Sequence, residues 1–303
     1  MRHWAALLMT ATLAACEARR GTEETRLEVV VTVPAVGMWI EAIGGDLVDV
    51  RLLLPPGASP HVWQPSARDL RTLADAPLAV FAGGGLEPWA SEVMRASATT
   101  RRDLVLVEWL QSQGLIEEPD GRTGSHGDHG HHHAEDPHVW LSPRLARAVC
   151  PHLLALLTEA APGRREALTA HWAANAAQVE GALTLCEERR ASLSSLRVIQ
   201  FHRSWENLAR DAGFTVVGTI EPTPGVEPSP RAMRALIDMA QRERANAVIA
   251  EPQLNPAAAQ RLAAALDIPL AVLDPYGQRG ETYVEFIRRN LDALAAAVGP
   301  EAP

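Results

Sequence analysis

Four side chains able to bind a metal ion each follow a short apolar run of the kind that forms β-strands: His61, His138, His202 and Asp274. They are spread over more than two hundred positions, so no local motif connects them. In open parallel α/β sheets, ligands bind outside the carboxyl ends of the strands, where loops from different strands meet. Three imidazoles and one carboxylate make a complete set of ligands for a zinc-like ion. The sequence therefore predicts one metal site built from four distant segments.

Two of these histidines lie in the same tetrapeptide, Pro-His-Val-Trp, at residues 60–63 and 137–140. The proline restricts the backbone in front of the histidine, and the tryptophan can shield the imidazole from water. A single histidine before a helix is more often a cap or a surface group, but recurrence of the whole tetrapeptide favours metal binding. His202 could instead be a hydrogen-bonded core histidine, and Asp274 could cap a turn or a helix at Pro275.

A different kind of metal-binding segment is predicted at residues 124–135, GSHGDHGHHHAE, which combines five histidines with three glycines. Such a composition cannot build a core, so we expect a mobile loop. Its imidazoles titrate near neutrality and could collect metal weakly and exchange it. The alternative is a solvated tract that binds metal only in the test tube. The histidines concerned are His126, His129, His131, His132 and His133.

The first residues have the form of an export signal. Residues 1–15 join Arg2 to an apolar stretch too short to span a bilayer permanently, which predicts a signal peptide. Small residues directly before Cys16 resemble a bacterial lipobox, in which the cysteine becomes the lipidated N-terminus. Residues 16–26 would then be the lipidated cysteine and a polar tether. A simple secretory signal with an incidental cysteine is the alternative.

Composition limits the remaining possibilities. The net charge of -9 argues against binding to nucleic acid or to anionic membrane surfaces, which leaves a lipid anchor as the expected contact with a membrane. No later run is long enough and free enough of charge to cross a membrane. Cys150 and Cys186 lie on helical patterns whose offset in an antiparallel hairpin is too large for a disulfide, so we expect buried free thiols.

Alternating strand and helix patterns predict an α/β fold with two lobes, because near-continuous Val and Leu runs are typical of buried parallel strands. Strands are expected at residues 27–33, 48–54, 78–83, 104–107, 198–201, 215–220, 247–250 and 270–273. Helices are expected at residues 36–43, 67–74, 88–96, 204–212, 230–242 and 256–266, with Ser229 and Asn255 as caps of the last two.

An apolar stripe with helical period from residue 164 to about residue 192 predicts one long, stiff helix between the lobes. The expected domains are therefore an N-terminal (β/α)4 lobe at 27–163, which includes the His-rich loop, a linking helix at 164–193 and a C-terminal (β/α)4 lobe at 194–303. On this division His202 is the only imidazole that the second lobe supplies.

Nearly all of the chain after the export signal resembles the solute-binding proteins of zinc and manganese ABC importers. The segments that carry the resemblance are GASPHVWQPSARDL, LADAPLAVFAGGGLEPW, DPHVWLSP, FHRSWENLARDAGF, EPSPRAMRALIDMA, AEPQLNP and LDPYG. The resemblance implies two lobes joined by a rigid helix, with an ion held in the cleft by His61, His138, His202 and Asp274. It also implies an exported, non-enzymatic, monomeric protein whose partners are a membrane permease and its cytoplasmic ATPase.

The resemblance to the zinc-importing branch rests on the His-rich insert before His138. Some zinc members carry an acidic residue near the first ligand, whereas Ser59 and Pro60 precede His61 here, so the fourth ligand is expected to be Asp274 or water. Some manganese members have a carboxylate in place of His202. A nitrogen-rich set favours Zn²⁺ over Mn²⁺. Because some manganese-binding relatives have three histidines, Mn²⁺ stays the alternative.

Two other classes compete with this interpretation. A zinc hydrolase would use three histidines and an open position to activate water, and residues 126–129 faintly resemble a hydrolase motif. However, the sequence has no His-Glu-x-x-His, and the glycine-rich tract cannot hold fixed geometry. A surface adhesin or structural lipoprotein would need only the anchor at Cys16. A hydrolase must turn over an ester or amide substrate, a binding protein must hold one ion tightly without turnover, and an adhesin needs neither, so metal content measured together with turnover separates the three classes.

Overall fold

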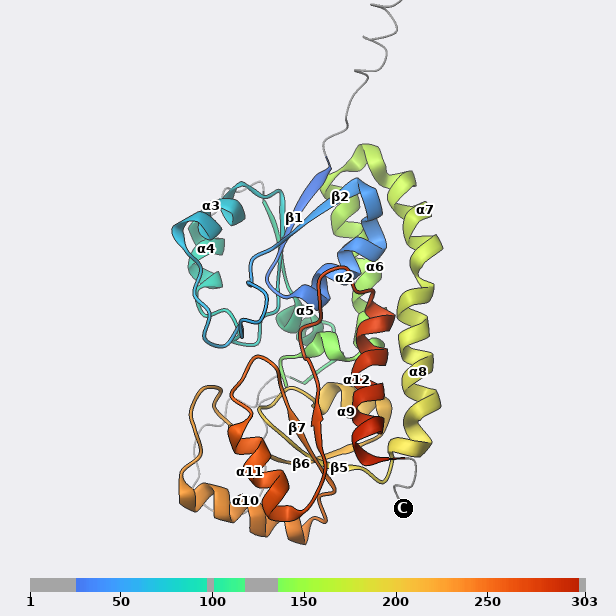
Figure 1. The fold of residues 1–303 in the computed structure, drawn as a ribbon. Coiled ribbons are helices and arrows are strands. Elements are labelled where there is room, and N and C mark those ends of the chain that lie inside the picture. The colour runs from blue at the N-terminus through green and yellow to red at the C-terminus, as the bar shows by residue number, and fades with distance from the viewer. Residues whose placement is uncertain (1–25, 97–100, 118–135, 300–303) are drawn as a thin grey trace, which may run out of the picture.

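The computed structural model describes residues 26–96, 101–117 and 136–299, so the predictions for Cys16 and for the His-rich tract lie outside the described residues. It contains two four-stranded parallel sheets, one in each half of an elongated molecule (Figure 1). The two sheets repeat one topology, with strand orders β2-β1-β3-β4 and β6-β5-β7-β8. The predicted α/β fold with two lobes is confirmed, whereas the exact domain boundaries stay a prediction.

The first sheet is made of short parallel strands, with the mainly apolar strands β1 and β3 at its centre. Its strands are β1 (Leu27–Val31), β2 (Val48–Leu52), β3 (Leu78–Phe81) and β4 (Arg102–Val105). Its helices are α2 (Pro34–Gly44), α3 (Ala67–Asp75), α4 (Ala90–Ala96) and α5 (Leu106–Ser112). Leu106 and Val107, expected in a strand, instead begin α5, because the paired strand ends at Val105, opposite Phe81 at the end of β3.

The second sheet follows the same plan. Its strands are β5 (Arg197–Gln200), β6 (Thr215–Thr219), β7 (Ala247–Ala250) and β8 (Leu270–Val272), and its helices are α9 (Glu206–Ala212), α10 (Pro230–Arg242) and α11 (Ala257–Leu266). Ser229 caps α10 as predicted, because its hydroxyl accepts from Ala232 N at 3.2 Å. Asn255 Oδ1 accepts from Ala257 N at 3.1 Å, although Pro256 occupies the cap position.

Four helices bind the two sheets together: α6 (Pro143–Ala160), α7 (Arg165–Asn175), α8 (Ala177–Leu193) and α12 (Tyr283–Val298). Short 3-10 turns lie at Gly45–Leu47, Val139–Leu141 and Pro162–Arg164. The predicted long helix is present as α7 and α8, which run along both lobes (Figure 1). Ala176 between them keeps a right-handed helical backbone, so the interruption is one tight turn rather than a hinge. The helix α12 was not predicted.

One apolar core extends through both lobes. It includes Val29 of the first sheet, Ile249 of the second and side chains of the helices between them. Cys150 and Cys186 are buried in this core as free thiols, which confirms that prediction. In the described segments, no helix has both the length and the apolar character that crossing a membrane requires. The shared core makes the two lobes a single packed frame for the site between them.

Candidate metal centre

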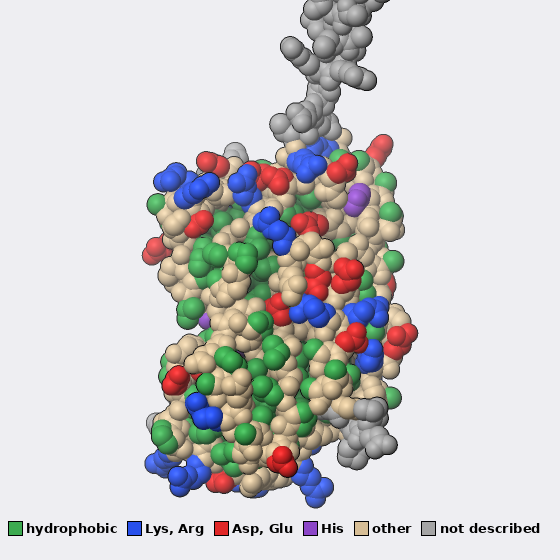
Figure 2. Space-filling model, in the orientation of Figure 1, with side chains coloured by type: hydrophobic (Ala, Val, Ile, Leu, Met, Phe, Trp, Pro, Cys, Tyr) green, Lys and Arg blue, Asp and Glu red, His purple; other side chains and the backbone are tan. Residues whose placement is uncertain are grey.

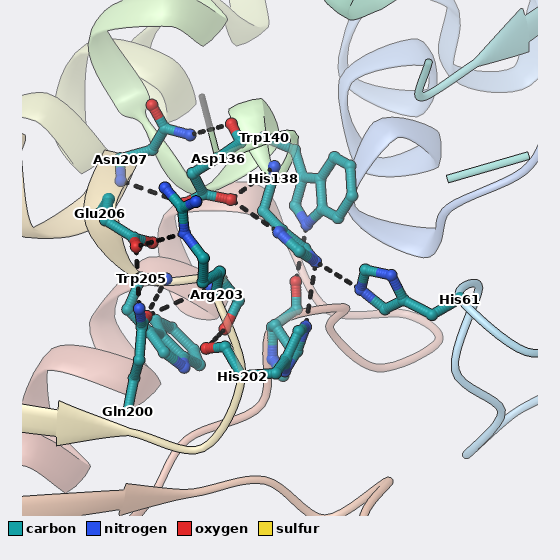
Figure 3. A network of polar contacts seen from close by, with 12 residues as sticks. His61, Asp136, His138, Trp140, Gln200, His202, Arg203, Trp205, Glu206 and Asn207 are labelled. Atoms are coloured by element: carbon teal, nitrogen blue, oxygen red, sulfur yellow. Dashed lines mark hydrogen bonds and ion pairs between the residues drawn. The ribbon is translucent and has the colours of Figure 1, made fainter. Parts of the chain in front are cut away.

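Three of the four predicted ligands meet at one point between the lobes (Figure 3). His61 lies in the loop between β2 and α3, His138 lies directly before the 3-10 turn Val139–Leu141, and His202 follows β5. The Nε2 atom of His138 is 3.2 Å from His61 Nε2 and 3.2 Å from His202 Nε2. One ring nitrogen from each histidine lies within 4.8 Å of the others. The three imidazoles therefore point one ring nitrogen each at a common centre.

The surroundings keep two of these imidazoles neutral. Burial, followed by the charge of the neighbouring imidazoles, lowers the pKa of His61 to about 2. Burial and the charge of His202 likewise lower the pKa of His138 to about 3. A neutral imidazole is the form that binds metal, so neither residue needs to lose a proton near neutral pH.

Asp136 sets the orientation of His138. Its Oδ1 accepts from His138 N at 2.9 Å and lies 2.7 Å from His138 Nδ1, and both side chains are buried. A carboxylate accepts only, so the ring proton belongs on Nδ1 and the Nε2 lone pair faces the other histidines. Burial raises the pKa of Asp136, while its hydrogen bonds oppose that rise. The carboxylate fixes both the tautomer and the ring plane.

Glu251 has the same relation to His202. Its Oε2 lies 2.8 Å from His202 Nδ1, although the angle at that contact departs from a directed hydrogen bond. The other oxygen accepts from Ser204 Oγ at 3.0 Å and Trp205 Nε1 at 3.1 Å. Burial lowers the pKa of His202, but the charge and hydrogen bonding of Glu251 and the charges of Asp136 and Glu206 together outweigh burial, so the pKa is raised overall. We take the short contact as an ion pair, because both groups are buried and nothing else described pairs with these two atoms.

The segment that carries His138 is attached to the second lobe. Trp140 Nε1 donates to Pro275 O at 2.7 Å, and Tyr283 OH donates to Trp140 O at 2.9 Å. Asn207 Nδ2 donates to Asp136 O at 3.0 Å. By chain position, His202 is the only one of the three clustered histidines that belongs to the second lobe, but His138 is held by the same frame. The two histidines form a fixed pair.

His61 is the least enclosed of the three. Its neighbour Val62 is 63% exposed, whereas His138 is completely buried. The loop is held locally, since Val62 N and Trp63 N both donate to Ser59 O, at 3.3 and 3.1 Å. In the space-filling view, histidine is visible in a notch between the two lobes (Figure 2). His61 is only partly buried, whereas His138 and His202 are buried, so the site is more accessible at His61.

Asp274, the fourth predicted ligand, lies outside the group of three. Its Oδ1 accepts from Gln253 Nε2 at 2.8 Å and from Tyr276 N at 3.1 Å. Its Oδ2 lies 3.4 Å from Arg289 Nη2. Asp274 follows β8 as predicted and neighbours Pro275, which contacts Trp140. Its role as a ligand stays a prediction.

The sequence analysis did not identify Asp136 and Glu251 as the carboxylates behind His138 and His202. Both had a readable signal: Asp136 stands two residues before His138, and Glu251 follows β7 as His202 follows β5. The rule that ligand-binding residues follow strand ends would have included Glu251.

The two parallel lobes with imidazoles converging between them define a two-lobe metal-binding protein. The chain belongs to the family ZnuA, described as zinc-uptake complex component A periplasmic, whose model matches residues 29–297. Members of this family are solute-binding components of an uptake complex and not enzymes, so the hydrolase alternative is excluded.

Similar proteins support this family assignment. The zinc-binding lipoprotein AdcA of Streptococcus pneumoniae is 25% identical over 301 residues, which cover 96% of this chain and 59% of the relative. The high-affinity zinc uptake system protein ZnuA of Yersinia pestis is 25% identical over 283 residues, with 86% and 87% covered. A crystal structure of a zinc-bound ZnuA deletion mutant is 26% identical with a TM-score of 0.71, and the match covers 91% of this chain and 99% of that one. The chain thus spans about three fifths of the AdcA length.

Proposed function

We propose that this protein captures zinc outside the cytoplasm and delivers it to the membrane permease of an ABC importer that is driven by a cytoplasmic ATPase. The observation that carries the proposal is the cluster of His61, His138 and His202, whose Nε2 atoms face one another. Imidazole nitrogen suits Zn²⁺, whereas Mn²⁺ prefers oxygen ligands. The zinc-binding names of the relatives support the same cargo.

We propose His61, His138 and His202 as the three protein ligands, with Asp274 or water in the fourth position. Carboxylates behind two of the rings support this set, because such partners orient metal-binding imidazoles and raise their basicity. Mn²⁺ stays the alternative cargo, and it would require the Asp274 carboxylate more than Zn²⁺ does.

The proposal also covers segments outside the described residues. Lipidation at Cys16 after a signal peptide would anchor a monomer to a membrane, and Cys16→Ser should then release it to the soluble fraction. A single acyl chain gives only marginal retention, so two or three chains are required for stable anchoring. Unchanged membrane association of the variant would contradict the anchor. The His-rich tract would add weak, exchangeable sites through His126, His129, His131, His132 and His133.

The test of the function is a metal titration of the purified protein against a competing chelator. His61→Ala, His138→Ala and His202→Ala should each weaken tight zinc binding by orders of magnitude, because each removes one ligand. His152→Ala is the matched control, since His152 stacks on Trp109 and takes no part in the cluster. Full tight binding by His202→Ala would refute the site, and absence of any tight metal site would favour the adhesin alternative.

A further inference from the structure

The segment of Asp274 adjoins the histidine cluster, because Pro275 O accepts from Trp140 Nε1 at 2.7 Å and the Tyr276 ring centroid lies 6.3 Å from that of His138. The backbone of Asp274 is itself held in place. Asp274 N donates to Asn290 Oδ1 at 2.8 Å, and Asn290 Nδ2 donates back to Asp274 O at 3.0 Å. Asn290 is 1% exposed, so both bonds are protected from water. Only rotation of the side chain could therefore bring an oxygen of Asp274 to a bound ion.

The two oxygens of Asp274 are bound very differently. Oδ1 accepts from Gln253 Nε2 at 2.8 Å, from Tyr276 N at 3.1 Å and from Gly277 N at 3.4 Å. Among the described residues, the one polar contact of Oδ2 is with Arg289 Nη2, at 3.4 Å. A charge-assisted N–H to O bond of full strength is about 2.7–2.9 Å long. The Oδ2 contact is thus long, and Oδ2 is the oxygen that can be released.

Arg289 does not depend on Asp274 for its position. Glu281 holds the guanidinium with both oxygens, at 2.8 Å to Nε and 3.0 Å to Nη2. The stacking distance of 6.0 Å from the guanidinium carbon to the Phe286 ring adds a second support. Arg289 therefore stays beside Asp274 as a fixed cation that competes with any metal ion for Oδ2.

We propose that Arg289 is a specificity-determining residue. Its ion pair with Asp274 keeps the Oδ2 atom of Asp274 from binding the metal ion, and the site therefore favours zinc over manganese. This inference rests on the proposed function, since it assumes that the three histidines hold the ion. With the pair closed, the protein offers imidazole nitrogens alone. With the pair open, Asp274 Oδ2 joins them, and an added carboxylate benefits Mn²⁺ more than Zn²⁺.

The first experiment compares Arg289→Met with Arg288→Met. Arg288 is an exposed residue next to Arg289 on α12. Arg288→Met removes the same charge, but no contact with Asp274, so it is the matched control. Competition with a chelator gives the Zn²⁺ and Mn²⁺ dissociation constants. Arg289→Met should tighten Mn²⁺ binding about fivefold and Zn²⁺ binding about twofold or less, as expected for loss of a partly exposed ion pair worth about 1 kcal/mol. Arg288→Met should change neither by more than about twofold.

A second pair of variants separates release of Asp274 from a general loss of positive charge. In an Asp274→Asn background, Arg289→Met should have no further effect on either metal, because no carboxylate remains to be released. If repulsion of the cation were the cause, the tightening would persist in that background. Persistence would overturn the proposal.

Glu281→Gln should change the Mn²⁺ affinity in the opposite direction. This variant also tests the proposal if Arg289→Met fails to fold. Weaker binding to residue 281 leaves Arg289 free to pair more closely with Asp274, so Mn²⁺ binding should weaken about threefold and the effect should vanish with Asp274→Asn. An unchanged ratio of the two affinities in these variants, while His202→Ala still abolishes tight zinc binding, would refute the role of Arg289 alone. Tight binding by His202→Ala would instead refute the proposed function.

Discussion

Replacement of Glu251 by glutamine should reverse the tautomer of His202. In the native protein, Glu251 Oε1 accepts from Ser204 Oγ and Trp205 Nε1, and Oε2 faces His202 Nδ1 at 2.8 Å. A glutamine would keep its Oε1 on the two donors and turn its amide nitrogen to the imidazole. The amide N–H donates to Nδ1, which places the ring proton on Nε2. That proton would occupy the position where the metal must bind.

The expected loss is about 10- to 100-fold in zinc affinity, the range for removal of a partner that orients a metal-binding histidine. Its pH dependence follows from the pKa of His202, which Glu251 raises. In the native protein, a proton on His202 competes with the metal as pH falls through this raised pKa. In Glu251→Gln the pKa of His202 is lower, so competition begins at lower pH. The difference between the two proteins should be largest at high pH and should narrow as pH falls.

Competition titrations from about pH 5.5 to about pH 8.5, on either side of the ordinary histidine pKa, measure both effects. Intrinsic fluorescence is a poor readout, because Trp205 itself bonds to Glu251. Glu243→Gln is the matched control, since Glu243 pairs with Arg197 at the surface. A Glu251→Gln protein with native affinity at every pH, or a difference that grows as pH falls, would refute the reasoning.

Four further outcomes follow from the site. Zinc binding near neutral pH should release about one proton, from His202, whose pKa is raised. His61 and His138 should release none, because their pKa values are lowered to about 2 and about 3. Calorimetry in buffers of different ionisation enthalpy counts the protons. Gly84→Ala should cost about 1–3 kcal/mol of stability and weaken zinc binding, because its φ is +60° and a Cβ would lie 2.7 Å from Pro137 Cβ, next to His138. Gly85→Ala, with φ +83° and open space, should lose stability only, and equal affinities of the two variants would contradict the link to His138. Deletion of residues 124–133 should lower total metal bound at high zinc while the tightest dissociation constant stays within a few fold; loss of tight binding would move the site into the tract. Amide exchange at Val62 and Trp63 should be faster than at Trp140 without metal and should slow when zinc binds; equal protection at all three would contradict a more mobile His61 loop.

The strand pattern and the rule of strand ends were enough to predict both sheets and the region of the site. Apolar runs at 247–250 and 78–83 needed little correction, because buried parallel strands are apolar on both faces. The boundary between β4 and α5 was wrong, since Leu106 and Val107 suit either state and pairing with β3 decides between them. Local composition gives no means of making that decision.

The attachment of His138 could not be predicted, because it depends on contacts across long stretches of chain. Trp140 meets Pro275 and Tyr283 only after the second lobe has folded against the first. The hydrogen bonds of Asp274 have the same character, since Gln253 and Arg289 lie in separate elements. Sequence showed which side chains have metal chemistry, but tertiary packing decides which of their atoms are free to use it.

The resulting site combines fixed and adjustable ligands in a way that suits a carrier. His138 and His202 are buried and backed by Asp136 and Glu251, so displacing either ring would separate a buried carboxylate from its partner. Within the described residues, His61 contacts only the rings of the other two histidines and has no carboxylate behind it, and its loop has an exposed neighbour, so it can leave the centre at lower cost. An ion held by all three is bound tightly, whereas an ion held by two is bound weakly. If these three histidines hold the ion as proposed, its release to a partner requires movement of one loop rather than separation of the two lobes.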